Sequence, residues 1–315
     1  MFAFAEGQIA KANQIDIWYE TFGQKEDPAI LLIMGGLAQG ILWPTEFCEQ
    51  LANKGFYVIR YDHRDAGFSS CFDFQKTPYD LNDMAKDGIG LLDHLGIEKA
   101  NLVGLSMGGP IAELMSVHFP ERISTITLMA TSNDFRPSSY TFDGLPLEEG
   151  WLSPPLPIYL NWMHKFLNEP AKNQEEALEQ RLEAWQILSG FTVPFETERY
   201  REIHKEFLSR LKHPESLTNH LEAIKRSFDL IATVPSQVKV PTLIFHGTVD
   251  PINPPDHGES LARAIQGSKY IQVEGFGHVP NKAFYDLFVS EIAALASGMM
   301  KNEPATTTIS FSAGN

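Results

Sequence analysis

Short apolar runs alternate with amphipathic stretches along roughly the first 130 residues of this sequence. Buried strands are expected at AILLIM (29–34), FYVIRYD (56–62), ANLVGL (100–105) and ISTITLMATS (123–132), with IDIWYETFG (15–23) as an outer strand. Helices are expected between these strands. Because strands that alternate with helices form βαβ units, the pattern predicts an α/β fold: a mostly parallel, twisted sheet flanked by helices.

The alternation stops in the middle of the chain and then resumes. Three helical stretches are expected near 172–190, 195–212 and 214–233, and a helical block placed between strands is typical of a cap over one edge of a sheet. We therefore expect an α/β core in two parts (1–132 and 236–298), a helical cap (133–235) and a polar, flexible tail (299–315).

Composition limits the classes of function. The net charge of −15 argues against a nucleic-acid partner, whose phosphates require clustered Lys and Arg. No apolar run is long enough to span a bilayer, and the first residues lack the basic start of a secretion signal. The two cysteines, Cys48 and Cys71, have no metal-binding or pairing spacing. These features predict a cytoplasmic protein without a membrane partner or a metal site.

The sequence GLSMGG (104–109) stands at the junction between an expected strand and an expected helix. A direct turn from strand to helix forces its apex toward positive φ, which costs a non-glycine residue about 1 kcal/mol. Gly104 and Gly108 flank Ser106 with residues that lack a Cβ and so leave room for such a turn. The turn would hold the Ser106 hydroxyl above the sheet edge, beside the N-terminus of the next helix. We therefore interpret Ser106 as a nucleophile, against the alternative of a merely structural turn.

A serine nucleophile needs a base to take its proton and a carboxylate to orient that base. His278 lies in VEGFGHVPN, directly after the last expected strand, where its loop can reach the same edge of the sheet. Asp250 lies in the strand-to-loop segment FHGTVDPINPP, where the strand gives way to a proline-rich loop, one helix and one strand before His278. Asp134, which follows an earlier strand, is the rival acid.

The other histidines compete less well for the role of base. We expect His63 to hold the shape of its loop, and His246 to be a packed, hydrogen-bonded residue inside a strand. Seven more are expected on helices or their flanks, in solvated or capping positions: His94, His118, His164, His204, His213, His220 and His257.

Attack on a carbonyl also requires hydrogen-bond donors for the developing oxyanion. The backbone N–H of Met107, the residue after the nucleophile, is one expected donor. The second is expected in the glycine-rich loop MGGLAQG (34–40), where Gly36 is the first choice and Leu37 the alternative. The glycines of this loop could also serve only to make a turn.

The three motifs resemble those of the α/β-hydrolase family, over nearly the whole chain from about Ala10 to Ser297. GLSMGG is similar to its nucleophile elbow, FHGTVDPINPP to its acid loop and GFGHVPN to its histidine loop. LLIMGGLAQGILWP and VIRYDHRDAGFSS look like segments of the aclacinomycin methylesterase-type group and related ester hydrolases, which more often read Met-Gly-Leu-Gly at 34–37. The resemblance implies an α/β-hydrolase fold with a cap domain, no metal, no organic cofactor, and a monomer or homodimer.

These observations predict a serine hydrolase that cleaves small to medium carboxylic esters through an acyl-enzyme intermediate. The same triad could instead cleave thioesters, lactones or carbon–carbon bonds, or act as a cofactor-free haloperoxidase or perhydrolase. A non-catalytic ligand receptor with an intact triad is an alternative of another class.

Substrate contacts are expected from Leu37 and from three cap residues, Trp162, Phe166 and Trp185. Other large cap residues could line the same pocket or form the cap's own core: Trp151, Met163, Phe191 and Phe195. The charged run EPAKNQEEALEQRLE (169–183) is expected to be a solvated helix face.

Overall fold

The computed structural model describes residues 7–300 and 306–310. Nine strands in this part of the chain form one sheet in the order β1-β2-β4-β3-β5-β6-β7-β8-β9. Their bounds are β1 Gln8–Ala12, β2 Ile15–Phe22, β3 Ala29–Ile33, β4 Tyr57–Tyr61, β5 Ala100–Leu105, β6 Ile123–Met129, β7 Thr242–Gly247, β8 Lys269–Val273 and β9 Thr306–Ile309. β2 pairs antiparallel with β1 and β4, and every other pair is parallel. The mostly parallel sheet expected from the sequence is therefore confirmed.

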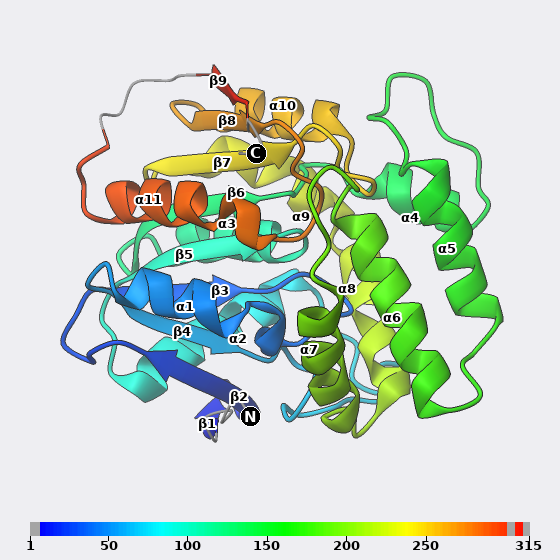
Figure 1. The fold of residues 1–315 in the computed structure, drawn as a ribbon. Helices are drawn as coiled ribbons and strands as arrows, with labels where there is room; N and C mark the ends of the chain where they lie inside the picture. Colours follow the sequence, from blue (N-terminus) through cyan, green and yellow to red (C-terminus); the bar gives the residue numbers. More distant parts are fainter. Residues whose placement is uncertain (1–6, 301–305, 311–315) are drawn as a thin grey trace.

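Helices cover both faces of the sheet (Figure 1). α1 (Thr45–Ala52) and α11 (Tyr285–Ala296) pack on one face, and α2 (Leu81–Leu95), α3 (Gly108–His118) and α10 (Pro255–Ala264) on the other. α2 starts at a capping box of Asp80 and Asp83, and ends at Gly96, whose φ of 71° suits a residue without a Cβ. The strands β3, β4 and β5 are buried along their whole length because helices cover both of their sides.

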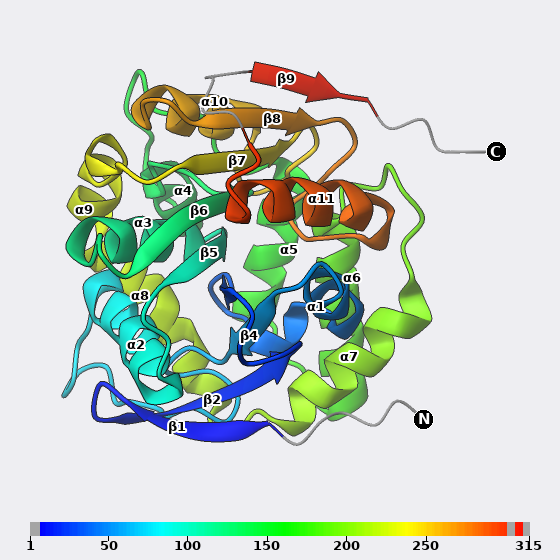
Figure 2. The same cartoon turned by 90° about the vertical axis from the view of Figure 1, so that its left-hand side faces the viewer.

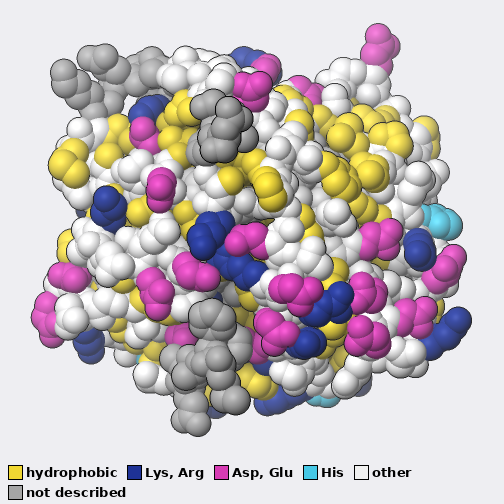
Figure 3. Space-filling view, in the orientation of Figure 1, with side chains coloured by type: hydrophobic (Ala, Val, Ile, Leu, Met, Phe, Trp, Pro, Cys, Tyr) yellow, Lys and Arg dark blue, Asp and Glu magenta, His cyan; other side chains and the backbone are white. Residues whose placement is uncertain are grey.

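A layer of helices lies between β6 and β7 in the chain and beside the carboxyl ends of the parallel strands (Figure 1). It consists of α4 (Arg136–Phe142), α5 (Pro157–Asn168), α6 (Gln174–Leu188), α7 (Thr197–Ser209), α8 (Asn219–Arg226) and α9 (Phe228–Thr233), with short 3-10 turns at Pro214–Thr218 and Pro235–Gln237. Two further 3-10 turns, Gly40–Leu42 and Lys282–Phe284, belong to the core. Acidic and basic side chains lie interspersed on the outer surface of α6 and α7 (Figure 3). We refer to α4–α9 as the helical layer, and the division into a core and a cap remains an interpretation.

Several elements differ from the expectation. β1 was not expected, so β2 is the second strand of the sheet rather than the outer one, and β1 and β9 form opposite edges (Figure 2). β9 lies within the segment expected to be a flexible tail, whose residues 301–305 and 311–315 fall outside the described part. The stretch 214–233 is a 3-10 turn and two short helices, broken at Ser227. No helix of the described residues is long and apolar enough to cross a membrane.

Candidate active site

The turn between β5 and α3 has the expected strain. Ser106 has a φ of 52°, and its backbone is fixed on both sides by hydrogen bonds, from its N–H to Met129 O (3.0 Å) and from Thr131 Oγ1 to its carbonyl (2.7 Å). A Cβ on Gly104 would lie 2.3 Å from the Gly108 carbonyl oxygen, and a Cβ on Gly108 would lie 2.2 Å from the Ile33 carbonyl oxygen. Both of these close contacts would be with backbone atoms, which cannot move aside as a flexible side chain can. Only glycine therefore fits at these two positions on either side of Ser106.

His278 and Asp250 meet at the carboxyl ends of β7 and β8. His278 Nδ1 lies 2.9 Å from Asp250 Oδ2 and 3.0 Å from Oδ1, and both side chains are buried. Asp250 Oδ1 also accepts the backbone N–H groups of Ile252 and Asn253, each at 2.9 Å. Burial alone would raise the pKa of Asp250, but the His278 ring, the His246 ring and the Asn253 N–H hold it below its usual value. An ionised Asp250 therefore keeps a proton on His278 Nδ1 and leaves Nε2 as the ring's other nitrogen.

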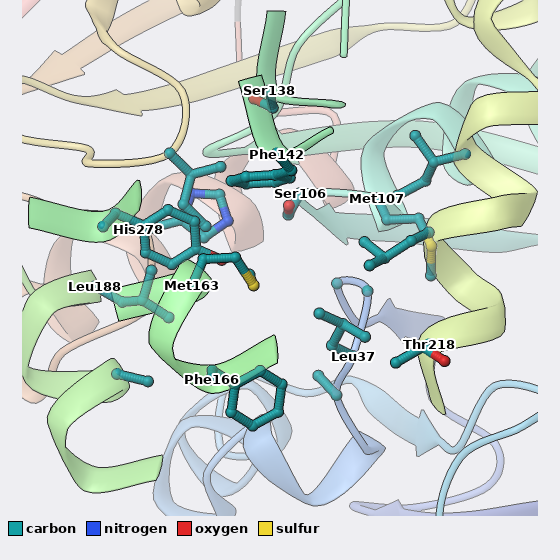
Figure 4. A pocket seen from close by; sticks show the side chains of 18 of the residues that line it. Leu37, Ser106, Met107, Ser138, Phe142, Met163, Phe166, Leu188, Thr218 and His278 are labelled. Atoms are coloured by element: carbon teal, nitrogen blue, oxygen red, sulfur yellow. The ribbon is translucent and has the colours of Figure 1, made fainter. Parts of the chain in front are cut away.

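Ser106 and His278 line the same cavity, of about 230 Å³ (Figure 4). The Ser106 hydroxyl forms no hydrogen bond with a described residue, and neither does His278 Nε2. Catalytic hydrogen bonds in ligand-free sites are often longer than in the substrate complex. The arrangement places an unengaged hydroxyl and an unengaged ring nitrogen on one cavity wall.

Among the backbone N–H groups at this cavity, those of Gly36 and Met107 have no hydrogen-bond partner in the described part of the chain. They come from the loop after β3 and from the start of α3, whose positive dipole end favours negative charge. The Leu37 N–H, by contrast, donates to His220 Nδ1 at 3.1 Å. Since its donor is already engaged, Leu37 is the weaker of the two alternatives for the second oxyanion donor.

Aromatic and aliphatic side chains form most of the cavity wall. The expected contact residues Leu37, Trp162, Phe166 and Trp185 all line it, as does Met163. Three other large residues of the helical layer lie elsewhere: Trp151 is 4.9 Å from the Arg136 guanidinium, Phe195 stacks on Tyr200, and Phe191 is exposed.

The sequence did not reveal several lining residues. Tyr159 lies on α5 and Phe142 on α4, and neither helix was expected because prolines surround them. Pro157 and Pro137 in fact occupy first-turn positions, where proline favours a helix. Arg181 also lines the cavity, although its run was expected to be a solvated face. The run did contain a sign of a buried face. Leu178 and Leu182 are spaced i, i+4, which places them on one side of a helix next to Arg181, and both are buried.

The competing residues have other partners. Asp134 forms an ion pair with Arg136 at 2.7 Å, so the rival acid does not reach His278. His63 donates from Nε2 to the Met34 carbonyl (2.9 Å), and His246 Nε2 lies 2.8 Å from Asn253 O; both match the structural roles expected for them.

Three histidines contradict the expectation of solvated or capping positions. His204, His220 and His257 are fully buried, because α7, α8 and α10 turn these faces toward neighbouring elements. His257 contacts Ser132 Oγ and Ser153 O. Among the described residues no three His, Cys, Asp or Glu side chains gather in a way that could hold a metal ion.

Comparison with known proteins places the chain in a family. A family model described as alpha/beta hydrolase fold matches residues 28–282. The chain belongs to the α/β-hydrolase fold family. This confirms both the resemblance found in the motifs and the fold class expected from it.

Relatives in this family act on different bonds. Rhodomycin D methylesterase of Streptomyces peucetius is 34% identical over 292 residues, which cover 90% of this chain and 95% of that protein. A 2-hydroxy-6-oxononadienedioate/2-hydroxy-6-oxononatrienedioate hydrolase of Paraburkholderia phymatum is 26% identical over 273 residues, 84% of this chain and 85% of that one. A solved mutant of the meta-cleavage product hydrolase from Pseudomonas fluorescens IP01 has a TM-score of 0.71 at 18% identity, over 93% of this chain and 98% of that one.

Proposed function

We propose that this α/β hydrolase cleaves carboxylic esters through an acyl-enzyme intermediate on Ser106. One observation carries the proposal: a strained serine and a carboxylate-bound histidine share a cavity with two unpaired backbone N–H groups. The methylesterase relative, which aligns over 90% of the chain, supports the same class of reaction.

The proposed triad is Ser106, His278 and Asp250. His278 Nε2 takes the proton of the Ser106 hydroxyl as the oxygen attacks the ester carbonyl, and Asp250 stabilises the imidazolium that forms. The imidazolium then gives its proton to the leaving alcohol, which departs and leaves an acyl-serine. In the second half, His278 takes a proton from water as the water oxygen attacks the acyl carbon, and then returns that proton to Ser106 Oγ as the bond to the acyl carbon breaks and the acid is released.

The Gly36 and Met107 N–H groups are the proposed oxyanion donors. Each tetrahedral intermediate carries its negative charge on the former carbonyl oxygen, which these groups would bind at the α3 N-terminus. Removal of one such donor in related chemistry costs about 10²–10³ in kcat, so a pair supplies a large share of the rate.

Cavity size and lining limit the substrate. A volume of about 230 Å³ lies just below the range of about 300–1,000 Å³ that holds drug-sized ligands. The apolar wall, to which Leu37, Trp162, Phe166 and Trp185 contribute, favours an apolar acyl group. The substrate class is therefore a small to medium ester, and methyl esters stand first because of the methylesterase relative.

The test compares hydrolysis of short p-nitrophenyl esters and of methyl esters by three proteins: wild type, Ser106→Ala and Ser116→Ala. Ser116 lies on the same helix as the elbow, but it is buried away from the cavity and donates to Glu113 O. We expect Ser106→Ala alone to lose turnover, by a factor of about 10⁶. Equal turnover by wild type and Ser106→Ala would refute the proposal, and a stoichiometric burst followed by a stall would favour a ligand receptor.

A carbon–carbon bond hydrolase is the second candidate, because the Paraburkholderia relative aligns over 84% of this chain. Faster cleavage of a vinylogous diketone than of any ester would favour it. Thioesterase, lactonase and perhydrolase activities are further outcomes of the same substrate panel. A monomeric or homodimeric state and a cytoplasmic location remain predictions from the sequence.

A further inference from the structure

Arg181 is a cation on the inner side of the helical layer. Its neighbours on α6 show the contrast: Glu179 faces outward and pairs with Arg201 of α7 at 2.6 Å, whereas Arg181 is only partly exposed and lines the cavity. A long charged side chain normally directs its head group to bulk solvent. Here the side chain instead forms part of the wall of the cavity that the substrate would occupy.

The guanidinium is held in place by uncharged groups. It lies 3.5 Å from the centre of the Phe207 ring, and its Nε–H donates to His204 Nδ1 at 3.3 Å. Burial holds the pKa of His204 well below its usual value, so this ring is neutral. Burial also lowers the pKa of Arg181 to about 9, which still leaves it protonated at neutral pH. The guanidinium is therefore a fixed and poorly hydrated positive charge.

No described residue neutralises this charge. Arg181 forms no ion pair within residues 7–300 and 306–310, and its two terminal nitrogens have no hydrogen-bond partner there. The Asp143 carboxylate, which also lines the cavity, is bound to Lys225 at 2.9 Å. Because poorly hydrated charges in proteins are usually paired, an arginine at a ligand cavity without an anionic partner among the described residues suggests an anion that arrives with the ligand.

The spacing along α6 locates this charge relative to the reacting groups. Arg181, Trp185 and Leu188 lie on one face of the helix and all line the cavity. The Leu188 carbonyl accepts the backbone N–H of His278 at 2.7 Å. Leu188 follows Arg181 by seven positions, so at 1.5 Å per residue the Arg181 backbone lies roughly 10 Å along the helix from the residue that binds the His278 N–H.

We propose that Arg181 is a specificity residue that binds an anionic oxygen, a carboxylate or an ionised phenol, at the end of the ester substrate remote from the scissile bond. The inference rests on the proposed ester hydrolysis and narrows its substrate class to apolar esters with a second, acidic group. The planar guanidinium suits this role because its two terminal nitrogens can bind both oxygens of a carboxylate.

The kinetic test compares pairs of esters that differ only in the remote group. One arm uses monomethyl esters of dicarboxylic acids of increasing length against their dimethyl esters; the other uses methyl esters that carry a nitrophenol, ionised at neutral pH, against the corresponding methoxy compounds. The readout is the ratio of kcat/KM for the acidic member to that for the neutral member, which does not depend on the active fraction of a preparation.

We expect the wild-type ratio to favour the acidic ester by roughly tenfold or more at one chain length, as a charge-assisted hydrogen bond would give. Arg181→Met should abolish this preference and Arg181→Lys should retain part of it. Arg201→Met, which removes an arginine from the outer surface, should keep the wild-type ratio. The two arms distinguish a carboxylate from a phenolate as the preferred group.

A binding measurement separates this inference from the proposed function. Ser106→Ala protein is titrated calorimetrically with the preferred acidic ester and its neutral partner, with and without Arg181→Met. Tighter binding of the acidic ester that depends on Arg181 would support the inference even if no ester were turned over. If wild type hydrolyses neutral esters through Ser106 but shows no acidic preference, or keeps its preference in Arg181→Met, the inference fails and the ester hydrolase stands.

Discussion

Replacing His220 with phenylalanine tests whether the helical layer sets the shape of the oxyanion loop, residues 34–40, which holds the proposed oxyanion donor Gly36. His220 lies on α8, where its Nδ1 accepts the Leu37 N–H at 3.1 Å and its Nε2–H donates to the Arg64 carbonyl at 2.8 Å. Leu37 has a φ of 59°, a conformation that costs a non-glycine residue about 1 kcal/mol and therefore needs support from its surroundings. His220 supplies that support from a distant part of the chain.

The expected magnitudes follow from these two hydrogen bonds. A phenylalanine of similar shape would leave the Leu37 N–H and the Arg64 carbonyl unpaired, at about 1–3 kcal/mol each, so the free energy of unfolding should fall by about 2–6 kcal/mol. Relaxation of Leu37 would also displace the preceding Gly36 N–H. Because complete loss of one oxyanion donor costs about 10²–10³ in kcat, we expect a fall of about tenfold to 100-fold in kcat with little change in KM.

Urea unfolding and steady-state hydrolysis of a p-nitrophenyl ester measure the two effects. His257→Phe is the matched control, because it removes an equally buried histidine with two contacts, to Ser132 and Ser153, that lie away from the loop. This control should lose stability and keep its kcat. If His220→Phe lost stability but kept the wild-type kcat, the idea that His220 positions the oxyanion loop would be wrong.

Three further predictions concern other parts of the structure. Asp250→Asn should lower kcat by about 10⁴ in the same assay, because the amide would favour the wrong tautomer of the histidine; a fall below tenfold would remove Asp250 from the triad. Gly108→Ala should lower the free energy of unfolding in urea by about 1–3 kcal/mol or more, because its Cβ would lie 2.2 Å from the Ile33 carbonyl oxygen. Gly36→Ala is the control and should fold normally, because the atom nearest to its Cβ would be the Met107 sulfur at 3.5 Å. Burial lowers the pKa of His63 to about 3, so the neutral ring contributes fully to stability above its unfolded pKa near 6.5, and this contribution is lost as the pH falls toward 3. The free energy of unfolding of wild type should therefore exceed that of His63→Gln by about 2–3 kcal/mol less at pH 4.5 than at pH 7. A difference that stays constant over this range would show that His63 does not titrate this way.

The sequence predicted best what depends on local periodicity and on glycine sterics. The buried parallel strands are apolar along their length, and their positions were found within a few residues. The positive φ of Ser106 followed from the need for a sharp turn between β5 and α3. The edges of the sheet were harder, because β9 is a run of exposed threonines that ends in the half-buried Ile309 and pairs with β8. A strand with one half-buried apolar residue gives no apolar pattern in the sequence.

The site was predictable where a motif fixes both residue type and position, and less so where burial decides. Asp250 and His278 lie at strand ends, which converge in any parallel sheet. His220 and Arg181, by contrast, look like ordinary polar residues of amphipathic helices. Their importance depends on which side of the helix faces the core, and packing between distant segments decides this. His220 and Leu37, for example, are more than 100 residues apart in the sequence.

The hydrogen bond between the Leu188 carbonyl and the His278 N–H ties the C-terminal end of α6 to the loop that carries His278, so we do not expect the helical layer to open at this end. A Cβ on Gly277 would lie 2.2 Å from that same carbonyl, so α6 and the histidine loop touch backbone to backbone. Moving the layer here would also move His278, the proposed base, away from Ser106. Elsewhere in the layer, an ion pair of Lys225 and Asp143, both partly exposed, joins α8 to the end of α4. We therefore expect the substrate to pass between these two helices while His278 stays in place.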